Sequence, residues 1–377
     1  MDTVLIIAGE KSGDHHGSAL VRELLKIDSA LNVFGIGGPS MRDAGVDTVY
    51  DISQMGIIGI WEVVKHLPFI RKTINHLKEL IETKNPKLVI LIDYPGFNLK
   101  IAQYAHSRGI KVLYYISPQV WAWGSGRIKK IAKCVDHMAV IFDFEQSLFS
   151  KHGIQSTFVG HPLLESVEVK LGREEFLSKY NLPSDNPILG LFPGSREQEI
   201  QRNLPEMVKT AHLFVQSNPN FKIGLSLADN LPIEIYAKHL EGTSITNVLD
   251  NQALMRYSAL SIVASGTSTL ESVILNTPFV VVYRVSPITY WIIKKIFIRI
   301  ENISLVNIVA GKLVVPEFIQ YDFKAEKIAP VLNDIMKDEK VRNEMCAGFE
   351  LVRQKLGTAG ASARVAKLAA SILSEGS

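Results

Sequence analysis

The 377-residue sequence is poor in cysteine. Cys134 and Cys346 are its two cysteines, far apart and without a CxxC motif, so a structural zinc site is excluded and a disulfide framework is improbable. A reduced, cytoplasmic protein is therefore expected. The apolar run Val4–Ala8 is too short for a signal peptide, and no stretch reaches the ~18 uncharged apolar residues of a spanning helix. Any membrane contact is expected to come from one side.

Net charge and several nucleotide motifs are also lacking. Forty-one basic and 38 acidic residues leave a charge of +3, which gives no reason to expect a nucleic-acid partner. The sequence contains neither GxxxxGK[ST] nor GxSxG, and the turn at 34–40 lacks the full dinucleotide fingerprint. His15 and His16 have no third ligand at useful spacing. We therefore predict no cofactor and no metal.

What is present is a repeated pattern of buried strand, turn and amphipathic helix. Hydrophobic residues make up 47% and charged residues 21% of the chain, as in ordinary globular enzymes. Continuous apolar strands separated by helices indicate parallel sheets covered on both faces. The predicted fold class is α/β, with two doubly wound Rossmann-like domains facing across a cleft. Predicted boundaries are 1–163, a linker at 164–184, a second domain at 185–350 and a C-terminal helix at 351–377.

Ligands bind at the carboxyl edge of open parallel sheets, so the loops that follow strands are candidate sites. In the loop at 191–200, Gly194, Ser195 and Arg196 stand at the mouth of a helix, where backbone N–H groups and a guanidinium suit a phosphate. The alternative is a plain turn with a solvated arginine.

A second loop spans residues 263–278. Ser265, Gly266 and Thr267 supply amides and hydroxyls for phosphate, and Glu271 supplies a carboxylate for ribose hydroxyls. The alternative is a capping box between Ser268 and Glu271. Two such loops in one half of the chain favour a nucleotide.

A third loop begins with Asp93, directly after an apolar strand. Burial would raise the pKa of its carboxyl group and suit it to act as a general base. The alternative is an Asx turn that ends the strand. In the first loop, Glu10, Ser12 and Asp14 are candidates for substrate contacts.

Two apolar stretches carry basic residues, at 55–70 and 288–300. In the second, Lys294, Lys295 and Arg299 fall on one side of a helical projection, as in helices that lie in a membrane interface. A buried helix between domains or between subunits is the alternative. The pair favours a lipid substrate.

The sequence resembles the lipid-A-disaccharide synthase family, glycosyltransferases of the GT-B fold, nearly from end to end. The matching stretches are AGEKSGDHHG (8–17), GIGGPSM (35–41), MGIIGIWEV (55–63), DYPGFN (93–98), YYISPQVWAW (114–123), FVGHPL (158–163), FPGSREQEI (192–200), ASGTSTLE (264–271), VVYRVSP (281–287) and SLVNIVAGKLVVPEF (304–318). The strings SPQVWAW and MGIIGIWEV are the most specific of these.

The resemblance implies transfer of a glucosaminyl group from UDP-2,3-diacylglucosamine to 2,3-diacylglucosamine 1-phosphate, in lipid A biosynthesis at the cytoplasmic face of the inner membrane. Asp93 would be the base, with Glu10 or a histidine as alternatives. The other implied roles fall into two groups: acceptor binding by Glu10, Ser12, Gly13 and Asp14, and UDP-sugar binding by Gly194, Ser195, Arg196, Ser265, Gly266, Thr267, Glu271, Tyr283, Arg284 and Asn307.

Two rival functions stay open at this point. A UDP-sugar 2-epimerase would share the architecture and the nucleotide loops, and a non-catalytic nucleotide-sugar-binding protein at the membrane would share the loops alone. A homodimer is possible as well, because the apolar stretches could be buried against a second subunit.

Overall fold

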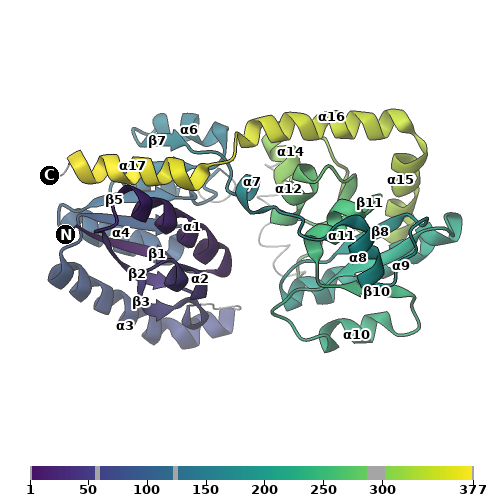
Figure 1. Cartoon of the computed structure of the whole chain (residues 1–377), viewed down its shortest axis with the longest axis horizontal. Coiled ribbons are helices and arrows are strands. Elements are labelled where there is room, and N and C mark those ends of the chain that lie inside the picture. Colours follow the sequence, from purple (N-terminus) through teal and green to yellow (C-terminus); the bar gives the residue numbers. More distant parts are fainter. Residues whose placement is uncertain (1, 56–59, 122–125, 287–301, 376–377) are drawn as a thin grey trace. The chain divides into compact units, whose positions relative to one another are not determined.

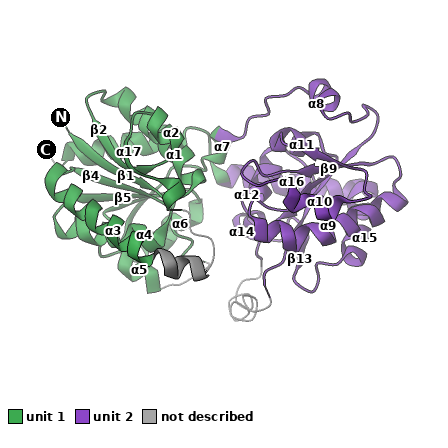
Figure 2. Ribbon diagram, turned by 90° about the horizontal axis from the view of Figure 1, so that it is seen from below, with its two compact units in different colours: residues 1–165, 356–377 green, residues 166–355 purple. Residues whose placement is uncertain are grey.

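Short apolar runs form the centres of two parallel sheets. The strands β4 (Leu88–Ile92), β8 (Ile188–Phe192) and β11 (Leu260–Ala264) are buried at every residue, as expected for strands covered on both faces. The computed structural model describes residues 2–55, 60–121, 126–286 and 302–375. The chain divides into two units, of which unit 1 is Met1–Glu165 with Leu356–Ser377 and unit 2 is Ser166–Lys355 (Figures 1 and 2).

In the described part of unit 1, the strands form a seven-stranded parallel sheet in the order β3-β2-β1-β4-β5-β6-β7. Helices α1 and α17 cover one face of this sheet, and α3 and α4 cover the other (Figure 2). Besides β4, the strands are β1 (Thr3–Ala8), β2 (Asn32–Gly37), β3 (Asp47–Asp51), β5 (Lys111–Tyr115), β6 (His137–Val140) and β7 (Gln155–Phe158). The helices are α1 (Lys11–Ile27), α2 (Pro39–Asp43), a 3-10 turn (Ile52–Gln54), α3 (Ile60–Lys84), α4 (Pro95–Ser107), α5 (Gly126–Ile131), α6 (Asp143–Ser150), α7 (Leu163–Ser166) and α17 (Ala361–Glu375).

Unit 2 repeats the pattern with a six-stranded parallel sheet over its described residues, in the order β10-β9-β8-β11-β12-β13. Its other strands are β9 (Lys222–Ser226), β10 (Ile245–Val248), β12 (Phe279–Tyr283) and β13 (Glu317–Ile319). The helices are α8 (Arg173–Lys179), α9 (Glu197–Ser217), α10 (Glu234–Leu240), α11 (Asn251–Tyr257), α12 (Thr267–Ile274), α14 (Leu305–Ala310), α15 (Ala325–Lys337) and α16 (Glu339–Leu356). The predicted α/β class with two doubly wound domains is confirmed at the level of the two sheets.

The domain limits differ from the predicted ones in two places. The stretch predicted as a linker, 164–184, folds largely onto unit 2, because α8 buries Phe176 completely and the Phe176 ring packs on the ring of Tyr257 at 5.5 Å. The C-terminal helix predicted at 351–377 is two helices. The first, α16, belongs to unit 2 up to Lys355, and α17 packs on α1 in unit 1 (Figure 2).

Polar contacts within unit 1 hold the returning C-terminal segment. The backbone N–H of His161 donates to the Leu356 carbonyl at 2.8 Å, and the side-chain Nε of Arg364 donates to the Val159 carbonyl at 2.7 Å. A contact between residues so distant in sequence leaves no local signal, and the helix pattern alone could not assign α17 to the first unit.

Candidate active site

The strand order of unit 1 reverses between β1 and β4, and ligands bind at such a switch point. The residues that follow these strands are Gly9 and Glu10 after β1, and Asp93 and Tyr94 after β4. Two of the loops singled out in the sequence therefore meet at one edge of the sheet. This adjacency is set by the topology and could not be read from sequence spacing.

Asp93 lies where the backbone is strained. Asp93 and Tyr94 both have left-handed backbone angles, with φ of +46° and +47°. Such angles are rare outside glycine and cluster at functional sites. The Asp93 side chain keeps an exposed face. Burial against surrounding protein, followed by the charge of Glu10, raises the pKa of Asp93 to about 6. A carboxyl group with this pKa can exchange a proton near neutral pH, which is what a general base requires.

Gly9 allows Tyr94 to lie against the first loop. A Cβ atom at Gly9 would be 2.3 Å from Cγ of Tyr94, so only glycine fits here. The ring of Tyr94 also packs at 5.8 Å from the ring of Phe97, and its hydroxyl donates to the Met55 carbonyl at 3.3 Å. The aromatic side chain after Asp93 is thus held between the loops that follow β1 and β4.

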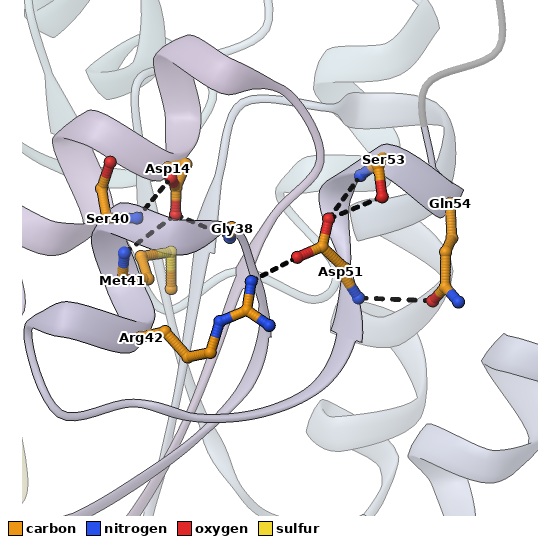
Figure 3. A network of polar contacts seen from close by, with 8 residues as sticks. All are labelled: Asp14, Gly38, Ser40, Met41, Arg42, Asp51, Ser53 and Gln54. Atoms are coloured by element: carbon orange, nitrogen blue, oxygen red, sulfur yellow. Dashed lines mark hydrogen bonds and ion pairs between the residues drawn. The ribbon is translucent and has the colours of Figure 1, made fainter.

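Asp14 has a different environment from the one predicted. It is buried, and its carboxylate accepts hydrogen bonds from the N–H groups of Gly38 at 2.7 Å, Ser40 at 3.0 Å and Met41 at 3.0 Å (Figure 3). These contacts hold the glycine-rich turn at the start of α2 against α1. The Asp14 carboxylate is taken up by the protein itself, which gives it a structural part here.

The other acceptor candidates lie at the start of α1. Glu10 and Ser12 are exposed. Gly13 is buried, and a Cβ atom there would be 3.2 Å from Cβ of Ala8, so Gly13 lets the helix approach β1 closely. Glu10 and Ser12 are the predicted acceptor residues whose side chains remain open to a ligand.

Sequence reasoning assigned no role to Glu145 and His161, which are buried at the same edge. Glu145 accepts hydrogen bonds from the hydroxyl of Ser117 at 2.5 Å and from the Trp121 indole N–H at 3.2 Å. Burial raises the pKa of Glu145 to about 7. Burial also lowers the pKa of His16 to about 4 and that of His161 to about 3, so both imidazoles are neutral near pH 7.

Ser117 and Trp121 lie in the stretch SPQVWAW, His161 in FVGHPL and His16 in AGEKSGDHHG, whereas Glu145 lies in none of the matching stretches. A low pKa of His16 also disfavours it as a positively charged contact. The burial that sets these pKa values is not visible in the strings, because it depends on packing between distant segments.

In unit 2 the strand order reverses between β8 and β11. The loop after β8 holds Gly194, Ser195 and Arg196, and the loop after β11 holds Ser265, Gly266 and Thr267. The two loops predicted to bind a nucleotide therefore meet at one edge of the second sheet, at the place where such folds bind ligands.

The first of these loops is closed by Glu199. Its Oε2 accepts from the N–H groups of Ser195 at 3.2 Å and Arg196 at 3.4 Å, and its Oε1 lies 3.5 Å from the Arg196 guanidinium. Gly194 has φ of +115°, and a Cβ atom there would be 2.4 Å from Glu199 Oε2. The Ser195 and Arg196 amides predicted to bind phosphate thus already have a carboxylate partner within the protein.

In the second loop, the hydroxyls of Ser265, Thr267 and Ser268 make no hydrogen bond among the described residues. Helix α12 has Gly266 as its N-cap without a side-chain cap, so the alternative of a Ser268 and Glu271 capping box is not observed. Glu271 is half-buried, and burial raises its pKa. A carboxylate that is desolvated and unpaired in the part of the chain the structure describes suits a ligand's hydroxyl groups.

The three other residues predicted to bind the UDP-sugar differ in whether their polar groups already have partners within the protein. Tyr283 lies at the end of β12, where its hydroxyl interacts electrostatically with Glu199 and Arg196. Burial is the main cause that raises its pKa, and the negative charge of Glu199 is the second. Asn307 is completely buried, and its amide is used by Val315, Val314 and Glu317.

Arg284 is likewise engaged by the protein. It donates to the Phe323 carbonyl at 2.5 Å, and its guanidinium lies 4.7 Å from the centre of the Phe323 ring. The structure thus brings Tyr283 to the two loops, whereas the polar groups of Arg284 and Asn307 have partners within the unit.

Parts of the two basic apolar stretches lie outside the described residues. Residues 56–59 of the first stretch and the whole of the second stretch, 288–300, lie outside them. Within the described ranges, no helix is long and apolar enough to cross a membrane. The same ranges contain no cluster of three or more metal-ligating side chains.

Solved structures of similar fold place the chain in a class. One is the UDP-GlcNAc 2-epimerase from Neisseria meningitidis bound to UDP-GlcNAc, with a TM-score of 0.65 at 11% identity over 99% of this chain and 100% of that one. Another is MurG from Acinetobacter baumannii, with a TM-score of 0.58 at 14% identity over 98% and 100%. With two doubly wound units and loops gathered at both switch points, this is a protein of the GT-B fold.

Sequence comparison narrows the class to a family. The family model described as lipid-A-disaccharide synthetase matches residues 4–371. The lipid-A-disaccharide synthase of Geobacter metallireducens is 45% identical over 98% of this chain and 97% of its own length, and that of Coxiella burnetii is 40% identical over 97% of each. The chain belongs to the lipid-A-disaccharide synthase family, and the resemblance seen in its motifs is confirmed.

Proposed function

We propose that this protein is an inverting UDP-dependent glycosyltransferase of lipid A biosynthesis. It would transfer the glucosaminyl group of UDP-2,3-diacylglucosamine to the 6-hydroxyl of 2,3-diacylglucosamine 1-phosphate, giving a β(1→6)-linked disaccharide 1-phosphate and UDP. Membership of the family supports the reaction. The observation that carries the mechanism is Asp93, an accessible carboxylate at a switch point with its pKa raised to about 6.

The proposed chemistry is one in-line displacement. Asp93 takes the proton of the acceptor hydroxyl as its oxygen bonds to the anomeric carbon, and the bond from that carbon to the UDP oxygen breaks. The electron pair leaves with UDP, so the diphosphate gains negative charge. Arg196 and the amides of the loop after β8 can stabilise that charge. Glu271 would bind the ribose, and Tyr283 would line the donor side.

The acceptor would bind at unit 1. Glu10 and Ser12 are the exposed candidates at the switch point, next to Asp93. The reaction would proceed without a metal ion, because positive charge for the leaving group is available from the protein. This part of the proposal is tested by turnover in the presence of EDTA.

Two further proposals concern where the protein works. The acyl chains of both substrates imply a membrane source, and the sequence stretches 55–70 and 288–300 combine apolar residues with basic ones, as at membrane interfaces. They support peripheral contact with the cytoplasmic face of the inner membrane. Burial of the same stretches against a second copy would instead give a homodimer.

The test is UDP release by the purified protein from UDP-diacylglucosamine, with and without diacylglucosamine 1-phosphate, in detergent with EDTA. Acceptor-dependent UDP release with a new disaccharide phosphate is the expected result. Asp93→Asn should abolish turnover and leave UDP binding nearly unchanged. An epimerised UDP-sugar, or donor binding without UDP release, would favour one of the two rival functions and overturn the proposal.

A further inference from the structure

The peptide group of Asp93 is held by buried partners. Its N–H donates to the Tyr115 carbonyl at 3.1 Å. Its carbonyl oxygen accepts two hydrogen bonds, from the Tyr114 hydroxyl at 2.5 Å and from Nδ2 of Asn98 at 2.7 Å. Tyr114 and Asn98 are both completely buried. Two side chains from different elements, β5 and α4, therefore converge on one carbonyl oxygen.

That carbonyl belongs to the strained part of the chain. Asp93 and Tyr94 are consecutive residues with left-handed backbone angles, and each such residue is unfavourable by about 1–3 kcal/mol unless its surroundings hold it. Asn98 also donates to the Ile92 carbonyl at 3.2 Å, so it holds the last residue of β4 as well. Without these donors, the turn would be free to relax toward ordinary backbone angles.

We propose that Tyr114 and Asn98 are positioning residues for the Asp93 carboxylate. With both its N–H and its carbonyl fixed, Asp93 retains rotation about χ1 and χ2 alone, so the carboxylate stays near the position from which it can reach the acceptor hydroxyl. Neither side chain is exposed to a substrate, and both act through the backbone of Asp93. The inference rests on the proposed function, in which Asp93 is the base.

The neighbouring tyrosine provides a matched control. Tyr115 is as fully buried as Tyr114 and lies on the same strand, but its side chain points to the opposite face. Its hydroxyl makes no hydrogen bond to Asp93, which meets Tyr115 through main-chain atoms. Replacing either tyrosine by phenylalanine removes one buried hydroxyl, so the two variants differ mainly in whether Asp93 loses a donor.

The experiment compares Tyr114→Phe with Tyr115→Phe in the acceptor-dependent UDP-release assay, over a range of pH. We expect Tyr114→Phe to lower kcat about tenfold or more, because small misplacement of a reacting group has large effects on rate. The acceptor KM should change little. The acidic limb of the kcat profile should move to lower pH, since a carboxylate that leaves its desolvated position titrates closer to its ordinary value. Tyr115→Phe should keep the wild-type limb and kcat.

Thermal unfolding of each variant serves as the check on folding, because Tyr114 and Tyr115 lie in unit 1, and UDP affinity, which depends on unit 2, should stay unchanged. Equal kcat values and equal pH profiles for the two variants would overturn the inference, and so would a loss confined to KM. If Tyr114→Phe is not recovered folded, Asn98→Ala takes its place, and a wild-type kcat in that variant overturns the inference. Failure of the proposed function is distinct, since wild-type protein would then show no acceptor-dependent UDP release.

Discussion

A methyl group at Gly9 would collide with the aromatic ring that follows Asp93. The added Cβ would lie 2.3, 2.4 and 2.8 Å from three ring atoms of Tyr94, whereas ordinary contact begins at 3.4 Å. Tyr94 must therefore move by about 1 Å, and Asp93 is its direct neighbour. A displacement of that size at a reacting group lowers rates up to about 100-fold. For Gly9→Ala we expect kcat to fall ~10- to 100-fold.

The assay is acceptor-dependent UDP release, with thermal unfolding measured on the same samples. Overpacking of this kind destabilises by about 1–3 kcal/mol, so the unfolding temperature should fall modestly while UDP affinity, which depends on unit 2, stays unchanged. Gly96→Ala is the matched control, because a Cβ at Gly96 has nothing within 4 Å and lies in the first turn of α4. A wild-type kcat for Gly9→Ala, or an equal loss for Gly96→Ala, would refute the reasoning.

Four further outcomes are expected. Glu10→Gln removes a negative charge that raises the pKa of Asp93, so the acidic limb of the kcat profile, near pH 6 in the wild type, should move to lower pH; an unmoved limb contradicts this. Glu271→Gln should weaken UDP binding about 10- to 100-fold in calorimetry, as loss of a charged hydrogen-bond acceptor does, and unchanged affinity would remove Glu271 from the site. Asn307→Ala should lower the free energy of unfolding by about 1–3 kcal/mol, because it leaves buried partners unpaired. UDP affinity should stay within about twofold, and a selective loss of UDP binding would instead support the predicted role of Asn307 in binding the UDP-sugar. Glu145 has a folded-state pKa of about 7, above its ordinary value of 4.5, so its contribution to stability is fully present below pH 4.5 and is lost as pH rises toward 7. The free energy of unfolding should therefore fall by on the order of 3 kcal/mol over this pH range, and Glu145→Gln should flatten that fall in denaturant titrations.

The sequence by itself was sufficient for the central strands of both sheets and for the loops that follow them. A run such as Leu88–Ile92 has no polar alternation, so it can be stable only when both faces are covered, and a parallel sheet provides that. Chain order then places Asp93, Gly194 and Ser265 after strands, at the edge where ligands bind. These properties are local or follow from general rules of topology.

Several side chains could not be assigned in this way. Asp14, Arg284 and Asn307 are polar residues in motif stretches, and the sequence offered no reason to separate them from Glu10 or Glu271. The partners of Asp14 lie 24 to 27 positions away, at Gly38 to Met41, and only the packing of α2 on α1 brings them to its carboxylate. Whether a polar group faces a ligand or the protein depends on such distant partners.

The same reason applies to the raised pKa of Glu145 and to the place of α17. An amphipathic helix shows that one face must be buried, but not which unit buries it. A carboxyl group in a sequence has its ordinary pKa until segments that are far apart along the chain exclude water from it. The sequence determined the central strands and the loops that follow them, and the tertiary structure decided the environment of each side chain, because desolvation and hydrogen-bond pairing are long-range properties of the folded chain.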